Sequence, residues 1–212
     1  LHDGATIAIE SGTRGIRFGE LQTEQGSSMM GYYKKSSAIS YYILGSKNTN
    51  SKLAGRIYNS ASGNKVGIIK EGTGTYTITG TNNDINAGIR LTKGTISVDN
   101  DIEQTKAEKG GGATGKNGSV IVYEDAVLAG IGSIASATEV YGSIKPGNNA
   151  TGTLYFTDFQ SETSQVKVTM HPESNIICQI ADTSCYDRLH IDGIVSYSNK
   201  TEDFDQSEKM PN

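Results

Sequence analysis

Short runs in which apolar and polar residues alternate recur along the whole chain, and a glycine or an asparagine interrupts them each time. Successive side chains of a β-strand point to opposite faces, so this alternation predicts strands that bury one face. The clearest runs are residues 6–10, 75–79, 94–98, 119–123, 153–157 and 188–192. We therefore predict an all-β fold of many short strands, with Tyr76, Ile78, Ile96 and Val98 pointing inward.

The residues between the runs favour one of two all-β arrangements. An antiparallel sandwich joins its strands by tight hairpins, yet Asn117-Gly118 is the only Asn-Gly hairpin signal, and it follows a glycine-rich loop. The recurring order is a strand, a glycine corner, a short polar run and another strand. A chain that winds round a coil and returns one strand spacing higher, about 4.8 Å, has this order. We predict a right-handed parallel β-helix, a single-stranded solenoid like that of the pectin lyases.

Composition agrees with a stack of short strands, because each rung buries only one face and each corner favours small or polar residues. Hydrophobic residues make up 35% of the 212 residues, glycine accounts for 26 and tryptophan is absent. The net charge is −4, and no long basic run occurs, so we expect no nucleic-acid partner. No apolar run reaches the roughly 18–20 residues that cross a bilayer, so we expect no transmembrane segment in this chain.

Residues 67–83 carry a specific motif: a hydrophobic pair, Lys70, a Gly-x-Gly-Thr step, an alternating strand and an asparagine-rich corner. This segment resembles the autotransporter-associated β-strand repeat, and residues 87–98 are similar to the second strand of that repeat. Further along the chain, four segments resemble later coils of the exported passenger domains that carry this repeat: residues 128–134, 144–147, 152–154 and 187–193. The resemblance therefore spans about residues 53–195. It implies a β-helix exported to the bacterial surface.

The functional expectation is a single β-helix segment over residues 1–212, secreted or displayed on the bacterial outer surface. The chain begins at Leu1 and not at Met, so we take it as a piece of a longer exported protein. We expect a non-catalytic structural or adhesive module, without cofactor or metal, that binds an extracellular protein or glycan. Its oligomeric state stays open.

A polysaccharide-degrading lyase or hydrolase is the alternative, because the same architecture supports such enzymes. The sequence shows no clustered set of acids for that chemistry, and it predicts no catalytic residue. The carboxylates on turns and strand edges are scattered: Glu71, Asp84, Glu124, Glu139 and Asp158.

Residues 101–118 break the strand pattern. Residues 101–109 have the composition of one or two helical turns, which the glycines at 110–112 end. Residues 110–117 nearly spell a phosphate-binding loop, but that motif needs a strand before it and a helix after it, and Asn117 replaces the Ser/Thr that holds magnesium. We predict a flexible inter-coil loop over residues 101–118 and no nucleotide site.

Two cysteines, Cys178 and Cys185, flank a turn-like string. An exported protein favours a disulfide between them, and two buried free thiols are the alternative that the spacing leaves open. No second pair of ligands accompanies them, so a zinc site is not expected.

A few other polar or aromatic residues invite a functional interpretation. His190 shares a predicted strand face with Arg188 and Asp192 and lies near Asp187, which suggests acid–base or metal chemistry; a solvated strand face explains the same pattern. Residues 82–86 imitate part of a calcium loop but lack its glycine and glutamate positions, so we predict a corner there. In each tyrosine pair, 32–33 and 41–42, one ring should be core and its neighbour exposed, where it could bind a sugar or a protein.

Overall fold

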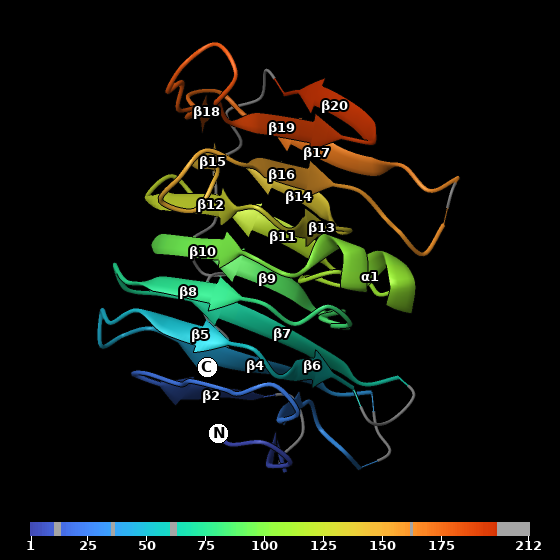
Figure 1. The fold of residues 1–212 in the computed structure, drawn as a ribbon. Helices are drawn as coiled ribbons and strands as arrows, with labels where there is room; N and C mark the ends of the chain where they lie inside the picture. The colour runs from blue at the N-terminus through green and yellow to red at the C-terminus, as the bar shows by residue number, and fades with distance from the viewer. Residues whose placement is uncertain (11–13, 35–36, 60–62, 162, 199–212) are drawn as a thin grey trace.

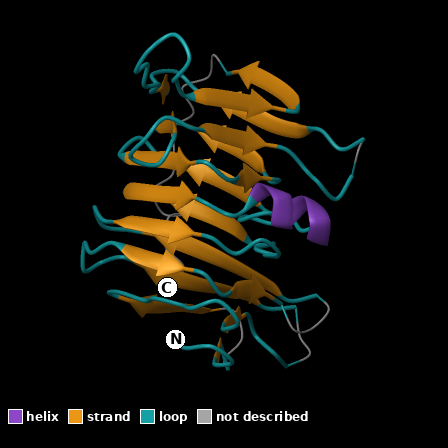
Figure 2. Cartoon of the chain, viewed as in Figure 1, coloured by secondary structure: helices purple, strands orange, loops and turns teal. Residues whose placement is uncertain are grey.

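The computed structural model describes residues 1–10, 14–34, 37–59, 63–161 and 163–198 of the chain (Figure 1). Strands dominate these residues, and every pairing between two named strands is parallel (Figure 2). The prediction of an all-β, parallel fold is confirmed.

The described strands form four sheets. Sheet A contains β1 (Thr6–Ala8), β3 (Ser28–Met30) and β6 (Arg56–Tyr58). Sheet B contains β2 (Arg14–Phe18), β4 (Ile39–Leu44), β7 (Lys65–Lys70), β9 (Gly88–Leu91), β11 (Ser119–Val122), β14 (Ala137–Val140), β17 (Val166–Met170) and β20 (Gly193–Tyr197). Sheet C contains β5 (Ser51–Leu53), β8 (Thr75–Ile78), β10 (Gly94–Val98), β12 (Ala126–Gly130), β15 (Ser143–Pro146) and β18 (Asn175–Ile176). Sheet D contains β13 (Ser133–Ile134), β16 (Thr153–Phe156) and β19 (Arg188–Ile191).

The chain visits these sheets in a repeating order. From β4 onward it passes through sheet B, then sheet C, and returns to sheet B beside its previous strand; we call one such passage a circuit. Four of these six circuits also include a described strand of sheet A or D before the return. Sheets A and D lie on the same side of the molecule. Between β6 of sheet A and β13 of sheet D, two isolated bridges link the circuits on this side, one from Asn82 to Gly112 and one from Gly112 to Ile134. The circuits therefore lie one above another along the molecule (Figure 1).

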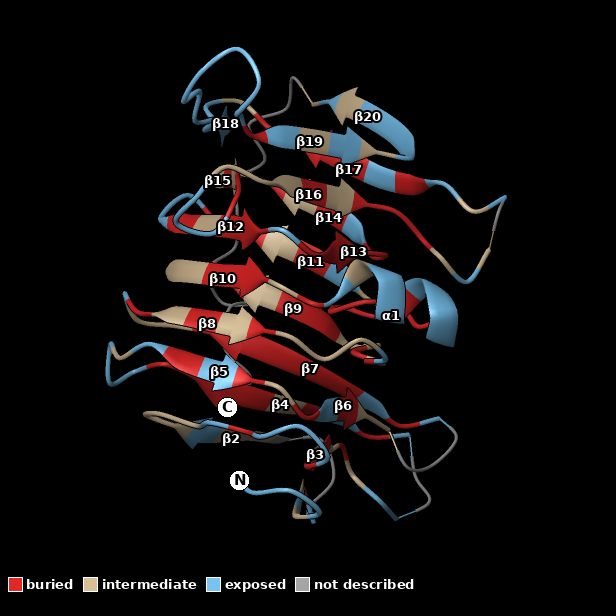
Figure 3. Ribbon diagram, viewed as in Figure 1, coloured by how far each residue is buried: buried red, intermediate tan, exposed pale blue. Residues whose placement is uncertain are grey.

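The core is a set of inward rows, each contributed by the same position of successive circuits. Ile78 and Val98 are register partners, as are Tyr76 and Ile96, and all four side chains are buried, which confirms their predicted inward orientation. Figure 3 shows buried residues throughout the middle circuits. The alternation that identified the strands thus also decides which side chains form the core.

Glycine is required where the chain turns from sheet B into sheet C before β8. Gly72 has φ +71°, and a Cβ there would lie 2.1 Å from the carbonyl oxygen of Gly45. A Cβ on Gly74 would lie 2.1 Å from the carbonyl oxygen of Thr49. Both obstacles are backbone atoms of the preceding circuit, so the Gly-x-Gly step allows two circuits to approach at strand spacing.

Asparagines at the corners connect each circuit to a neighbouring one. Asn83 is buried, its side-chain oxygen accepts a hydrogen bond from the Ile57 amide at 2.8 Å, and its Nδ2 donates to the Ala113 carbonyl at 3.0 Å. Residues 82–86 therefore form a corner, as predicted. The same kind of bond to a backbone amide of an adjacent circuit is made by Asn48, Asn50, Asn64, Asn86 and Asn100.

Lys70 occupies an inward row, between Leu44 and Leu91 of the adjacent strands, and is fully buried. Its ammonium donates hydrogen bonds to the carbonyl oxygens of Glu71 and Gly72, each at 2.7 Å, and to that of Lys93 at 3.1 Å. Burial lowers the pKa of Lys70 to about 8, although the charge of Glu71 opposes this shift. The hydrogen bonds of the Lys70 ammonium thus connect the corner after β7 with the corner after β9 in the next circuit.

Of the two tyrosine pairs, only the pair 41–42 has one ring in the core and its neighbour on the outer side, as predicted. Tyr42 is buried and its hydroxyl donates to the carbonyl oxygens of Ile7 and Met30, at 3.1 and 2.7 Å. Its neighbour Tyr41 lies on the outer side of sheet B, half-buried. In the other pair Tyr33 is exposed but Tyr32 is only half-buried, so neither ring belongs to the core, because that pair follows β3 and is not in a strand.

Residues 101–118 contain α1 (Ile102–Glu108) and then a return to the stack. Asp101 caps α1 through the Gln104 amide at 2.8 Å, and Lys109 ends it in the left-handed conformation at φ 47°, so the predicted helical turns are confirmed. Residues 110–115 are buried, and Ala113 belongs to the core cluster. The flexibility that we predict for residues 101–118 stays a prediction for α1. The burial of residues 110–115 argues against flexibility in that part of the segment.

Candidate functional site

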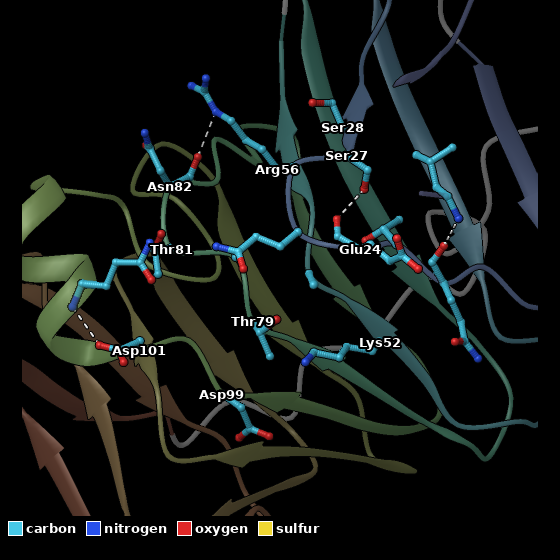
Figure 4. A pocket seen from close by; sticks show the side chains of 18 of the residues that line it. Glu24, Ser27, Ser28, Lys52, Arg56, Thr79, Thr81, Asn82, Asp99 and Asp101 are labelled. Atoms are coloured by element: carbon cyan, nitrogen blue, oxygen red, sulfur yellow. Dashed lines mark hydrogen bonds between the residues drawn. The ribbon is translucent and has the colours of Figure 1, made fainter. Parts of the chain in front are cut away.

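A groove of about 990 Å³ lies between the N-terminal segment and α1 (Figure 4). Its walls come from the N-terminal residues, the loop before β3, residues of β5 and β6, the corners after β8 and β10, and α1. Its charged lining residues are His2, Glu24, Lys52, Arg56, Asp99, Asp101 and Glu108. Sequence reasoning expected no acidic cluster, and it missed this one because its members belong to different circuits.

Most of the charged groups of the groove are held by neighbours in its walls. Asp101 caps α1 by accepting from the backbone amide of Gln104. Glu108 accepts hydrogen bonds from the Thr81 hydroxyl and from the side-chain amide of Gln104, and these bonds lower the pKa of its carboxyl. Arg56 donates from Nε to the Asn82 carbonyl at 3.1 Å. These residues therefore fix the shape of the groove.

Asp99 differs from them because burial raises the pKa of its carboxyl group above the usual range. Three neighbours work against that shift: the Ser97 hydroxyl at 3.0 Å, the Ile131 amide at 3.3 Å, and the Asn148 side-chain amide, together with the positive charge of Lys52. A raised pKa means that the carboxyl group keeps its proton to a higher pH than an ordinary aspartate, which is the property that a general acid needs.

A second hollow, which we call the aromatic recess, lies on the outer side of sheet D beside α1. Its volume is about 450 Å³, and it is lined by Lys106, Tyr155, Thr157, Asp158, Phe159, Ser161, His190 and Asp192. Tyr155 and His190 are register partners on β16 and β19, and their ring centroids are 5.3 Å apart. Lys106 of α1 reaches over the Phe159 ring, 5.6 Å from its centroid. The recess therefore combines aromatic faces, two carboxylates and two nitrogen donors.

The structure separates the residues that the sequence grouped around His190. His190 and Asp192 are exposed and both line the aromatic recess. Asp187 is buried and accepts backbone hydrogen bonds from Gly152 at 2.9 Å and Gln179 at 2.7 Å, so it supports a corner. Asp158, which the sequence left among scattered acids, joins the recess from the loop after β16. Tyr155 was missed, since only the strand register places it beside His190. Phe159 and Lys106 were missed because they come from a loop and from α1 and meet His190 only as lining residues of this hollow.

The two cysteines lie in the loop between β18 and β19, and both are exposed free thiols. An antiparallel bridge joins Ile180 to Tyr186, so Cys185 lies opposite Ala181 while Cys178 is three residues further along, or roughly 10 Å of extended chain. The structure thus has no disulfide between them, and the disulfide stays a prediction. The exposure of both thiols also differs from the alternative of buried ones.

Residues 110–117, which resembled a phosphate-binding loop, form part of the stack. Gly112 bridges Asn82 on one side and Ile134 on the other. The strand β11 follows, where a phosphate loop needs a helix.

Among the described residues, no group of three or more histidine, cysteine, aspartate or glutamate side chains is arranged to hold a metal ion. No helix of the described segments has the length and apolar character to cross a membrane. Comparison with models of known protein families and with curated protein sequences gives no match for this chain.

Proposed function

We propose that the chain is a right-handed parallel β-helix of the kind that forms autotransporter passengers, a single-stranded solenoid like that of the pectin lyases. The repeated passage through sheets B, C and A or D supports this proposal, as does the position of the repeat-like motif in β7 and β8. In this proposal the protein works outside the bacterial cell, secreted or on its surface, as a structural and adhesive module that does not catalyse a reaction.

We further propose that the ligand is a glycan and that the aromatic recess binds it, an inference carried by the composition of that recess. A sugar ring has an apolar C–H face that packs on an aromatic ring, and hydroxyl groups that donate to carboxylates. Tyr155 and Phe159 offer the rings, while Asp158 and Asp192 offer acceptors within the same hollow. Repetition of weak contacts among many molecules on one surface would then give strong attachment.

The test is binding of the purified protein to an array of oligosaccharides, followed by calorimetric titration with the best ligand. Tyr155→Ala should weaken that affinity by about tenfold or more, which corresponds to about 1.4 kcal/mol. Asp192→Asn should also weaken it, because an acceptor is lost. Tyr186→Ala is the matched control, since Tyr186 is an exposed tyrosine that does not line the recess. Equal affinity in all three variants, or no binding to any glycan, contradicts the proposal.

Asp99 supports a second candidate, a polysaccharide-degrading enzyme. Glycoside hydrolysis uses two carboxyl groups, one of which has a raised pKa, and the groove is lined by Asp99, Glu24 and Asp101. The measurement is release of reducing ends from neutral and acidic polysaccharides by the wild type and by Asp99→Asn. Turnover that is lost in Asp99→Asn would establish the enzyme and displace the adhesive proposal.

A further inference from the structure

The aromatic recess already holds a cation that the protein itself supplies. The ammonium of Lys106 lies over the ring of Phe159, 5.6 Å from its centroid, and forms an ion pair with Glu103 at 2.7 Å. A cation is attracted to the negative face of an aromatic ring, and more strongly where water is partly excluded. Phe159 is half-buried where it lines the recess, so its ring face is a position in which a positively charged group is stable.

The residue before Phe159 is a buried acid that also lines the recess. Asp158 is 5% exposed, and its Oδ1 accepts a hydrogen bond from the Gln160 amide at 2.9 Å. Its Oδ2 has no hydrogen-bond partner among the described residues. Lys116 and Lys167 line a second hollow that Asp158 also borders, yet within the described part of the chain neither forms an ion pair with it. A buried carboxylate is stable when it is paired, so the free oxygen favours a cationic donor from a ligand.

The charges that line the recess favour a cationic ligand over an anionic one. Its acids are Asp158 and Asp192, and its one lysine is Lys106, whose charge is balanced by Glu103 outside the recess. His190 adds a positive charge only when it is protonated. A sugar with a carboxylate of its own would bring a third negative charge close to these two acids, and like charges repel at such distances.

We propose that the glycan bound by the aromatic recess carries free amino groups, as an amino sugar without its acetyl group does. The ammonium of the sugar replaces that of Lys106 over the Phe159 ring and pairs with Asp158, while the sugar ring packs on Tyr155 in the same hollow. Lys106 stays paired with Glu103 and is an internal competitor for the position. This inference rests on the proposed glycan function and names the class of glycan.

Calorimetric titration with two matched probes tests the inference: an oligomer of β-linked glucosamine, and the same oligomer with every amine acetylated. At a mildly acidic pH, where the amines are protonated, the wild type should bind the glucosamine oligomer about tenfold or more tightly than the acetylated one. Asp158→Asn keeps the Oδ1 acceptor for Gln160 but removes the charge, so it should lose most of this preference and bind the acetylated probe as before. Asp125→Asn is the matched control, because Asp125 is exposed and does not line the recess.

Lys106→Gln tests the competition, since it removes the internal ammonium. It should bind the glucosamine oligomer more tightly than the wild type does and the acetylated oligomer equally well. Circular dichroism verifies the fold of each variant, and Asp192→Asn replaces Asp158→Asn if the latter is misfolded.

Three results would overturn the inference and leave the glycan function standing. They are equal affinity of the wild type for the two probes, a preference that persists in Asp158→Asn, and tighter binding of a matched glucuronic acid oligomer. Absence of binding to every oligosaccharide of the array contradicts the proposed function itself, and this inference with it.

Discussion

The middle circuits and the last circuit carry the same alternation but differ in burial. In β8 and β10 the inward side chains are buried, whereas in β18 and β20 the inward side chains are exposed. Their residue types do not explain the contrast, since both sets are large and apolar. A rung of this fold is buried by the rung above it, so burial is a nearest-neighbour property and not a property of the strand's own sequence.

The corners show the same contrast. In the middle of the molecule Asn83 and Asn100 are buried and bonded to backbone amides of adjacent circuits. Beyond β18 the chain runs through an exposed loop in which Ile180 lies in solvent. The corners of the middle circuits are thus bonded to neighbouring circuits, whereas this loop is bonded within itself: Asp182 accepts hydrogen bonds from the amides of Ser184 and Cys185.

Truncation of one inward residue in each region gives the largest expected difference. Ile96→Ala should lower the free energy of unfolding by about 2–5 kcal/mol, because it leaves a cavity between two circuits. Val195→Ala should lower it by less than about 1 kcal/mol, since that side chain is exposed. Urea denaturation followed by circular dichroism at low protein concentration measures both. Similar losses would mean that the last circuit is covered in solution.

Glycine replacement at a corner between circuits should be the next largest effect. Gly130 has φ +125°, and a Cβ there would lie 2.1 Å from the Val98 carbonyl oxygen of the circuit below. Gly130→Ala should therefore cost about 1–3 kcal/mol from backbone strain, plus the displacement of that carbonyl. Gly4 provides the control: its φ is +72°, but no atom lies within 4 Å of a Cβ built there, so Gly4→Ala should cost about 1 kcal/mol. Thermal unfolding compares the two, and equal shifts would show that the contact between circuits adds nothing.

Lys70 should give an effect on stability that depends on pH. Its pKa is lowered from 10.5 to about 8 in the folded protein, so between these values the unfolded chain binds more protons than the folded one. The free energy of unfolding should therefore gain a contribution that rises with pH over this window and is absent below it. Urea titrations across the window should show this rise in the wild type relative to Lys70→Met, in which the group cannot titrate. If the free energies of unfolding of the two proteins differ by the same amount at all these pH values, the pKa of Lys70 is not lowered by folding, which would contradict a buried ammonium.

The helix cap should have the smallest effect. Asp101→Ala removes the hydrogen bond to the Gln104 amide and should destabilise α1 by about 1 kcal/mol. Hydrogen exchange should become faster at the amides of α1 while those of β10 and β12 keep their protection, because α1 is not a rung of the stack. Faster exchange in both strands would show that the helix supports the circuits around it.

The sequence was sufficient to predict strands, inward residues and glycine corners, because each depends on neighbouring residues. The offset between circuits depends on corner length, which varies: Ile89 pairs with Val120, 31 residues later, whereas Val120 pairs with Thr138, 18 residues later. No local pattern determines these offsets. Tyr155 and His190 face one another only because their circuits happen to align, so the aromatic recess could not be predicted.

Helix α1 has a consequence for how such a molecule can change. The chain leaves the stack after Val98 and re-enters it at Gly112, which still bridges the circuits on either side of it. The intervening residues therefore alter neither the register of the strands nor the alignment of the core. The entropy cost of a longer loop grows only slowly with its length. This corner is thus a natural grafting position: a foreign peptide could be inserted at the exposed Lys109, with Thr105 retained because it is buried and bonded to Asn100. The peptide would then be carried at a fixed height along the molecule.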